Sequence, residues 1–214
     1  MRAPIVLATR SAGKIRELAA LCAEAGFAVE TLAALDLAED PREEGIESFD
    51  TFAENAEAKA AWFAGLLPGR FVLAEDSGLV VDALAGAPGV RSKRWSGAVA
   101  SGAALDGANN AALIAALAPW PAMSARRARY LCEAVLACDA ERWRGGGQVE
   151  GTITDAPRGS GGFGYDPYFS SVELDLTFGE ASADAKARVS HRARAVRALF
   201  DAARNALERR ARLC

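Results

Sequence analysis

Two adjacent carboxylates, Glu75 and Asp76, follow a short apolar run, FVLA, that begins at Phe71. The run predicts a buried strand, and the turn formers Ser77 and Gly78 predict that the strand ends at the acids. In open α/β sheets, ligands collect just beyond the carboxyl ends of strands. The acidic pair is therefore a candidate for metal binding or for activating a water molecule. Two solvated acids in a loop are the alternative, because Asp, Ser and Gly are also ordinary turn residues.

A candidate anion site lies early in the sequence, where residues 4–9 predict a strand and residues 10–13 predict a turn into a helix. The first backbone N–H groups of a helix and its dipole favour an anion, and Lys14 adds a positive charge there. The segment is not a Walker A loop, because Ala8 stands where that motif needs Gly and Ile15 where it needs Ser or Thr. A plain strand-to-helix turn is the alternative interpretation.

A glycine-rich stretch, GSGGFGYDPYF at residues 159–169, could hold a flat ligand. Its glycines let the backbone approach a ligand closely, and Phe163 and Tyr165 offer flat faces for stacking on a base. Asp166 could hydrogen-bond to the edge of that base. The only histidine, His191, precedes Arg192 at the start of a helix, where both can donate to an anion or a carbonyl. A mobile turn and a structural histidine are the alternatives.

The composition is that of a globular protein with ample material for a core. Of the 214 residues, 51% are hydrophobic and 25% charged, and the net charge of -3 argues against a general nucleic-acid binder. No apolar run approaches the ~18 residues of a membrane span, and residues 1–7 lack the apolar region of a signal peptide. We therefore expect a cytoplasmic protein that binds neither nucleic acid nor membrane.

The four cysteines, Cys22, Cys132, Cys138 and Cys214, include no CxxC pair. With a single histidine, this disfavours a zinc site of the usual type. We expect the cysteines to be reduced and mostly buried.

Further elements alternate between helices and strands. Thr51 and Glu54 predict a capping box for a helix to about residue 67. Residues 80–84 predict a brief strand, 103–117 a helix, and 129–138 and 148–153 strands. Ser182 and Ser190 are predicted to cap two final helices, the second running to about residue 210. No repeat or linker divides the chain.

Several motifs occur together in the order and approximate spacing of one enzyme family. They are ATRSAGK (residues 8–14), TFAENAEAKA (51–60), AEDSGL (74–79), GAPGV (86–90), GGFGYDP (161–167) and SHR (190–192), with Lys186 five residues before His191. Over nearly its whole length the sequence resembles the inosine triphosphate pyrophosphatase family, and within it the bacterial dITP/XTP pyrophosphatases.

The resemblance implies one homodimeric α/β domain over residues 1–214. A long mixed β-sheet flanked by helices would separate two lobes, with the active site in the cleft between them. Members of the family hydrolyse non-standard purine nucleoside triphosphates such as ITP, dITP and XTP to the monophosphate and pyrophosphate, which cleanses the nucleotide pool. They use Mg²⁺, with Mn²⁺ as a possible substitute.

Roles at the catalytic centre also follow from the resemblance. Asp76 would accept the proton of the attacking water near the metal ion, and Glu75 would be a second acid at the metal. Glu47 would be the remote metal ligand, with Glu44 as its substitute because this loop aligns loosely. The triphosphate would be cradled by Thr9, Arg10, Ser11, Ala12, Gly13 and Lys14.

The nucleotide would make further contacts along the chain. Lys59 and Lys186 would neutralise phosphate charge or touch the nucleotide, and Phe163 would stack on the base. Recognition of the edge of the base is assigned to Tyr165, Asp166, His191 and Arg192, and the remaining substrate-binding assignments are Ser77 and Gly164.

Two positions depart from the family pattern. Ser11 stands where Asn is usual, and Glu75 stands where Asp is usual. Serine can still donate to phosphate and Glu retains the charge, so we expect catalysis to persist with altered metal geometry. Two alternatives stay open: a pyrophosphatase for other modified or standard triphosphates, and a nucleotide-binding protein without turnover.

Overall fold

The computed structural model describes residues 3–211, without the side chains of residues 44, 210 and 211. The chain forms two compact units. Unit 1 contains the chain up to Asp76, residues Cys132–Gly147 and the chain from Arg192 onward. Unit 2 contains Ser77–Leu131 and Gln148–His191.

Seven strands form one mixed sheet in the order β2-β1-β3-β4-β5-β6-β7. Strand β1 pairs in parallel with β2 and β3, whereas β6 pairs antiparallel with β5 and β7. The mixed sheet flanked by helices that the sequence predicts is therefore confirmed. The strands are β1 (Ile5–Leu7), β2 (Val29–Thr31), β3 (Phe71–Val81), β4 (Arg127–Cys138), β5 (Glu141–Ile153), β6 (Phe169–Ser171) and β7 (Leu176–Thr177).

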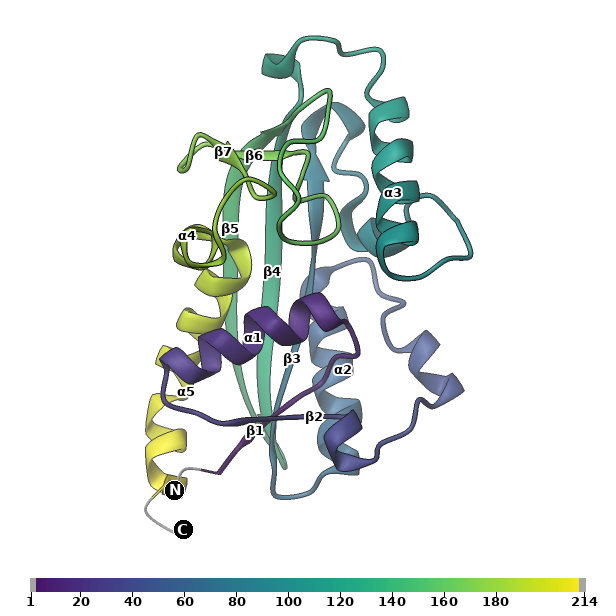
Figure 1. Ribbon diagram of the computed structural model, residues 1–214. Helices are drawn as coiled ribbons and strands as arrows, with labels where there is room; N and C mark the ends of the chain where they lie inside the picture. The colour runs from purple at the N-terminus through teal and green to yellow at the C-terminus, as the bar shows by residue number, and fades with distance from the viewer. Residues whose placement is uncertain (1–2, 212–214) are drawn as a thin grey trace. The chain divides into compact units, whose positions relative to one another are not determined.

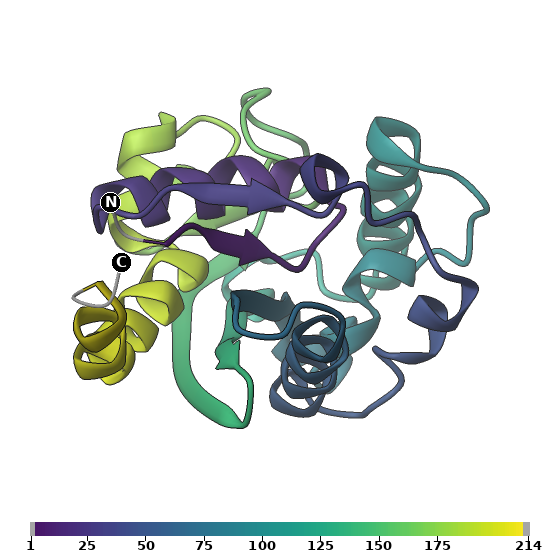
Figure 2. The ribbon, with the colours of Figure 1, turned by 90° about the horizontal axis from the view of Figure 1, so that it is seen from below.

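Helices cover both faces of the sheet in unit 1. Alternate residues of a strand point to opposite faces, and α1 (Ala12–Glu24) and α5 (His191–Ala211) pack on the face that carries Ile5 and Leu73. Helix α2 (Phe52–Leu66) packs on the other face, which carries Val6 and Val72. Figures 1 and 2 show α1 and α5 lying side by side in this unit. Two 3₁₀ helices, Ala33–Leu35 and Pro41–Gly45, complete it.

Unit 2 is built around an aromatic core. The ring of Phe169 lies 4.7 Å from that of Tyr130 and 5.1 Å from that of Phe178, measured between centroids. The α-helices of this unit are α3 (Gly102–Ala116) and α4 (Ala183–Val189), and its 3₁₀ helices are Asp82–Leu84, Gly89–Arg94 and Met123–Ala125. Within residues 3–211, no helix is both long and apolar enough to cross a membrane.

The predicted end of the strand at the acidic pair is wrong. Strand β3 continues through Ser77 and Gly78 to Val81, so Glu75 and Asp76 lie inside a strand, and the strand predicted at residues 80–84 does not form separately. Every residue of β3 except Ser77 is buried. Burial on both faces therefore overrides the turn preference of Ser and Gly, because tertiary packing outweighs local propensity.

Two of the predicted helix caps are confirmed, and the cap predicted at Ser190 stays a prediction. The Thr51 hydroxyl accepts from the Glu54 N–H, and the Ser182 hydroxyl accepts from the Ala185 N–H. Strand β5 begins at Glu141, seven residues before the predicted strand. The three cysteines within the described residues form no disulfide and are buried, as predicted, and Cys214 lies outside those residues.

One glycine lets a helix of unit 1 contact the sheet directly. A Cβ atom at Gly145 of β5 would lie 2.3 Å from the Ala195 carbonyl oxygen and 2.3 Å from the Leu199 nitrogen, both in the backbone of α5. Helix backbone cannot turn aside as a flexible side chain can. The absence of a side chain at Gly145 therefore determines how closely α5 packs on β5.

We predict that Gly145→Ala lowers the free energy of unfolding by about 3 kcal/mol or more, because the methyl group overpacks a rigid contact. The matched control is Gly65→Ala on α2, where an added Cβ meets no atom within 4 Å. That change should raise stability by about 0.5–1 kcal/mol, since Ala is the better helix former. Urea unfolding of both variants measures the difference, and equal stabilities would contradict the close packing of α5.

Candidate active site

The loop between β1 and α1 ends in a helix cap. The Ser11 hydroxyl accepts from the Lys14 N–H at 3.5 Å, and the Ser11 N–H donates to the Thr9 hydroxyl at 3.2 Å. Ser and Asn are both among the best N-cap residues. Serine at this position therefore preserves the cap of α1.

Glu75 is the centre of a buried ionic network in unit 1. Its side chain is fully buried, and its Oε1 lies 2.9 Å from Lys14 Nζ and 3.5 Å from Arg192 Nη2. The Cys132 thiol donates to Oε2 at 3.4 Å. Burial opposes ionisation, but the charges of Arg192 and Lys14 outweigh it and hold the pKa of Glu75 well below its usual value. Glu75 is therefore ionised at neutral pH.

Asp76 has a different electrostatic environment from its neighbour. Its side chain is 7% exposed, and burial raises its pKa above the usual value although Lys14 and Lys59 oppose the shift. The Asn55 amide donates to Oδ2 of Asp76 at 3.0 Å. A carboxylate with a raised pKa is a better proton acceptor than an ordinary Asp, which is the property that a general base needs.

The proposed remote acid lies on the loop that precedes α2. Glu47 forms an ion pair with Lys59, which is 8% exposed on α2. Burial opposes ionisation of Glu47, but the charge of Lys59 prevails and lowers its pKa. The side chain of Glu44, the alternative remote ligand that the family resemblance leaves open, lies outside the described residues.

The donor chemistry of this cluster fits Mg²⁺. Among the described residues, no three His, Cys, Asp or Glu side chains are grouped to hold a metal ion. Mg²⁺ is nonetheless usually held by only one or two carboxylates together with substrate phosphates and water. The network also contains more carboxylates than cations. The carboxylates are Glu17, Glu47, Glu75 and Asp76, and the cations are Lys14, Lys59 and Arg192. An added cation would therefore help to balance the charge of a bound phosphate.

Arg10 holds a neighbouring loop. Its guanidinium donates to both carboxylate oxygens of Glu43, at 2.9 and 2.7 Å. It also donates to the carbonyl oxygens of Leu37 and Ala38. These contacts fix residues 37–43 against the loop between β1 and α1. Ala12 is exposed and Gly13 is buried. Contacts of Arg10, Ala12 and Gly13 with a phosphate stay predictions.

The proposed base-binding residues of unit 2 form a separate cluster. The Phe163 N–H donates to Oδ2 of Asp166 at 2.8 Å, and the same oxygen pairs with Lys186. The ammonium of Lys186 lies 5.1 Å from the centroid of the Phe163 ring. One buried carboxylate thus fixes both the loop that carries the aromatic ring and the cation beside it.

Gly164, next to Phe163, is held on both sides of its backbone by α3. Its N–H donates to Asp106 at 2.8 Å, and its carbonyl accepts from the Asn110 amide at 3.0 Å. Gly164 has a φ of 62°, a conformation that favours glycine. A residue with a side chain would be strained in this backbone conformation, even though a Cβ atom here would meet no atom within 4 Å.

Tyr165 and His191 are both packed in the interior of unit 2. The Tyr165 hydroxyl donates to the Ser92 carbonyl at 2.8 Å, and burial raises its pKa. The His191 ring stacks on Tyr130 with centroids 4.6 Å apart. Half-buried Ser77 is the first residue of unit 2 within β3. Direct contact of these residues with a base stays a prediction.

Some of the predicted residues fall into these two clusters, whereas Arg10, Tyr165 and His191 pack against residues outside them. Arg192, which sequence reasoning assigns to the base, contacts Glu75 and Glu17 in unit 1. Sequence reasoning also missed Asn55, Cys132, Asp106 and Asn110. Only Asn55 carried a usable signal, since it lies four residues before Lys59 and so on the same face of α2.

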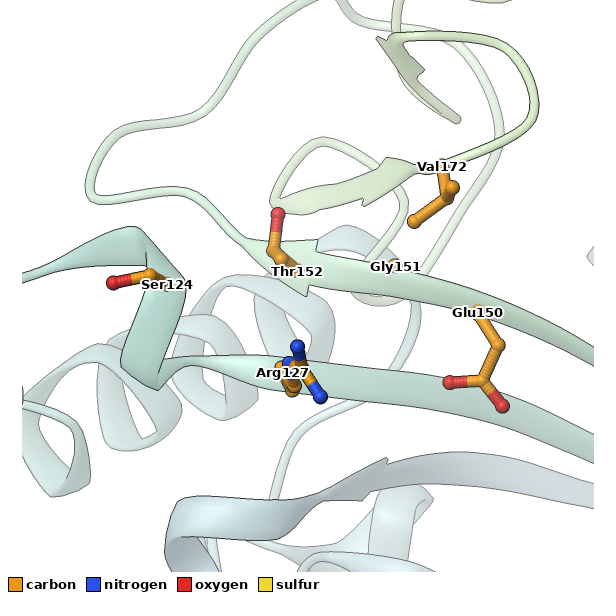
Figure 3. A pocket seen from close by; sticks show the side chains of 6 residues that line it. All are labelled: Ser124, Arg127, Glu150, Gly151, Thr152 and Val172. Carbon is orange, nitrogen blue, oxygen red and sulfur yellow. The ribbon is translucent and has the colours of Figure 1, made fainter.

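A hollow elsewhere in unit 2 contains none of the predicted site residues. Its volume is about 450 Å³, and Figure 3 shows the side chains that line it. They come from the start of β4, the end of β5, the residue after β6 and the 3₁₀ helix before β4: Ser124, Arg127, Glu150, Gly151, Thr152 and Val172. A single cation beside a carboxylate makes it poorly suited to a triphosphate.

The α/β fold and the buried acid and lysine cluster define a protein suited to phosphate chemistry. Comparison with known families identifies it further. The sequence profile of the Ham1 family matches residues 5–202, and the chain belongs to the Ham1 family.

Relatives and solved structures agree with this family. The chain is 44% identical to a dITP/XTP pyrophosphatase of Geobacter sulfurreducens, across 92% of this chain and 94% of that protein. It is 44% identical to another of Thermus thermophilus, across 92% and 90%. The structure of the Staphylococcus aureus Ham1 protein matches with a TM-score of 0.77 and 33% identity, across 95% of this chain and 99% of that chain.

We predict that Arg192→Leu lowers the free energy of unfolding by about 3–5 kcal/mol, because it removes a buried cation that pairs with Glu75 and Glu17. The matched control is Arg197→Leu, which removes a solvent-exposed ion pair between the same two helices, from α5 to Glu24 of α1. That change should cost less than about 1 kcal/mol. Thermal unfolding of both variants tests the difference, and a small effect at Arg192 would show that the network is not a stabilising element.

Proposed function

We propose that this chain is a nucleoside triphosphate pyrophosphohydrolase that acts on the non-standard purine nucleotides ITP, dITP and XTP. A water molecule attacks the α-phosphorus, the bond from the α-phosphorus to the bridging oxygen breaks, and pyrophosphate leaves with that oxygen. The products are the nucleoside monophosphate and pyrophosphate. The names of the Geobacter and Thermus relatives support this substrate class.

The observation that carries the proposal is the contrast between the two adjacent acids. Glu75 is held ionised by Lys14 and Arg192, whereas Asp76 has a raised pKa. Neighbouring carboxylates with opposed pKa shifts are typical of acid–base catalytic sites. In the proposal, Asp76 accepts the proton of the attacking water, and Glu75 orients Lys14 toward the phosphates.

Lys14 and Lys59 supply positive charge for the phosphate groups. The positive charges of both lysines favour the ionised form of Asp76, the proposed base. As pyrophosphate departs, negative charge accumulates on its oxygens, and fixed cations stabilise that charge without reorganisation. The first turn of α1 adds backbone N–H donors for a phosphate.

We assign Mg²⁺ to Asp76 with Glu47 or Glu75, because these are hard oxygen donors of the kind that it prefers. When bound, the ion would polarise phosphate oxygens and neutralise their charge. Mn²⁺ accepts similar ligands and is expected to substitute. We also propose that the enzyme is a cytoplasmic homodimer, as the family resemblance implies.

The base is assigned to the cluster of unit 2. Phe163 would stack on it, beside the Lys186 ammonium, which can donate to an acceptor on the ring. Inosine and xanthine carry a 6-oxo acceptor, whereas adenine carries a 6-amino donor. A site that presents buried donors therefore rejects adenine, since two donors would face each other without a partner.

We predict preferential pyrophosphate release from ITP, dITP and XTP over GTP, ATP and dTTP in the presence of Mg²⁺. Asp76→Asn should lower kcat on ITP by about 10²–10⁴-fold, the usual contribution of a general base. The control is Asp82→Asn, since Asp82 is a half-exposed surface acid that pairs with Arg129. A colorimetric pyrophosphate assay measures all of these rates, and a chelator should stop release until Mg²⁺ is restored.

Three outcomes would count against this function. Equal rates on all six nucleotides would favour a general triphosphate pyrophosphatase, and a preference for dTTP would favour a pyrimidine substrate. Binding of ITP without any release would indicate a nucleotide-binding protein. Full activity of Asp76→Asn would remove Asp76 from the role of base.

A further inference from the structure

Asn55 is a buried amide on α2 whose polar atoms are all committed. Its side chain is 1% exposed. Its Oδ1 accepts from the Phe49 N–H at 2.9 Å, and its Nδ2 donates to the Phe49 carbonyl at 3.2 Å and to Asp76 Oδ2 at 3.0 Å. One side chain therefore joins the loop before α2 to the proposed general base on β3.

These partners determine which way the amide faces. A backbone N–H can only donate, so the atom that faces the Phe49 nitrogen must be the amide oxygen. The amide nitrogen then carries two hydrogens, one for the Phe49 carbonyl and one for Asp76 Oδ2. The hydrogen-bond network thus fixes Asn55 as a donor to the Asp76 carboxylate.

We infer that Asn55 is a positioning residue for the reaction: its amide fixes the Asp76 carboxylate and ties it to the loop that carries Glu47. This inference rests on the proposed function. Phe49 lies two residues after Glu47, so the two backbone bonds to Phe49 also restrain the loop next to that acid. Asn55 and Lys59 lie one helical turn apart, and Lys59 holds the Glu47 side chain itself.

The neutral amide of Asn55 is well suited to orienting the Asp76 carboxylate. It holds one carboxylate oxygen in place and, unlike Lys or Arg, adds no cation that would compete with a metal ion for Asp76. A carboxylate at position 55 would have the same shape but no hydrogen to donate, so it would face Asp76 with like charge. Correct orientation of a catalytic group matters, because a displacement of about 1 Å can cost about 100-fold in rate.

Asn109 on α3 offers a matched control. It is 3% exposed, its Oδ1 accepts from the Ser96 N–H at 2.9 Å, and its Nδ2 donates to the Lys93 carbonyl at 3.0 Å. Asn55 and Asn109 therefore hold backbone in the same way. Only Asn55 also donates to a carboxylate of the proposed site.

The test compares Asn55→Asp with Asn109→Asp in steady-state hydrolysis of ITP. Each variant retains the acceptor for a backbone N–H and loses the donor to a backbone carbonyl. We expect Asn55→Asp to lower kcat about 100-fold with KM changed by less than about threefold. Asn109→Asp should retain kcat within about twofold for the folded fraction measured by circular dichroism. Equal effects on kcat, or an effect of Asn55→Asp on KM alone, would overturn the inference.

A second measurement does not depend on activity. It also tests the contact between Asn55 and Asp76 if Asn55→Asp fails to fold. We compare the ¹⁵N-correlated NMR spectra of the wild-type protein and of the Asp76→Ala variant. The side-chain NH₂ resonances of Asn55 should differ between the two spectra, whereas those of Asn109 should not. Unshifted Asn55 resonances would overturn the contact. If these resonances shift but the wild type releases no pyrophosphate from any triphosphate, the contact holds and the proposed function fails.

Discussion

The buried carboxylate of Glu75, held by Lys14 and Arg192, is the interaction on which the rest of unit 1 depends. It joins the first turn of α1, the middle of β3 and the first turn of α5 at one point. Removing these charges from water is costly, and only close pairing repays that cost. Because loss of any one partner would leave a buried charge uncompensated, the three segments must come together in one arrangement. Lys14 is thereby fixed in place before any substrate binds.

The sheet and helix α2 fix the second half of the same site. Ala56, Ala60 and Phe63 hold α2 against the sheet, and the face of α2 beside them carries Asn55 and Lys59. Asn55 contacts Asp76 and Lys59 contacts Glu47, so one helix aligns the proposed base with the proposed remote acid. The geometry of the site is therefore a consequence of how the core packs. Because Asn55 and Lys59 lie on a rigid helix, their side chains can hold the catalytic groups in place before a substrate binds.

Local sequence signals predicted most of the elements, but they could not predict how distant residues interact. Caps at Thr51 and Ser182 depend on neighbours three residues away, so the sequence shows them directly. Strand β3 was predicted too short because Ser77 and Gly78 favour turns, and only burial on both faces keeps them extended. The acidic pair and Lys14 could be singled out by type. The contacts of Glu75 with Arg192, and of Asp76 with Asn55, depend on tertiary packing between segments far apart in the sequence.

We propose that water, with Asp76 as its base, attacks the α-phosphorus of a purine nucleoside triphosphate. Hydrolysis of ITP in H₂¹⁸O, with mass spectrometry of both products, distinguishes attack at the α-phosphorus from attack at the other phosphorus atoms. One ¹⁸O atom should enter inosine monophosphate, and the pyrophosphate should carry none. Appearance of ¹⁸O in pyrophosphate, or release of inorganic phosphate as the first product, would contradict it.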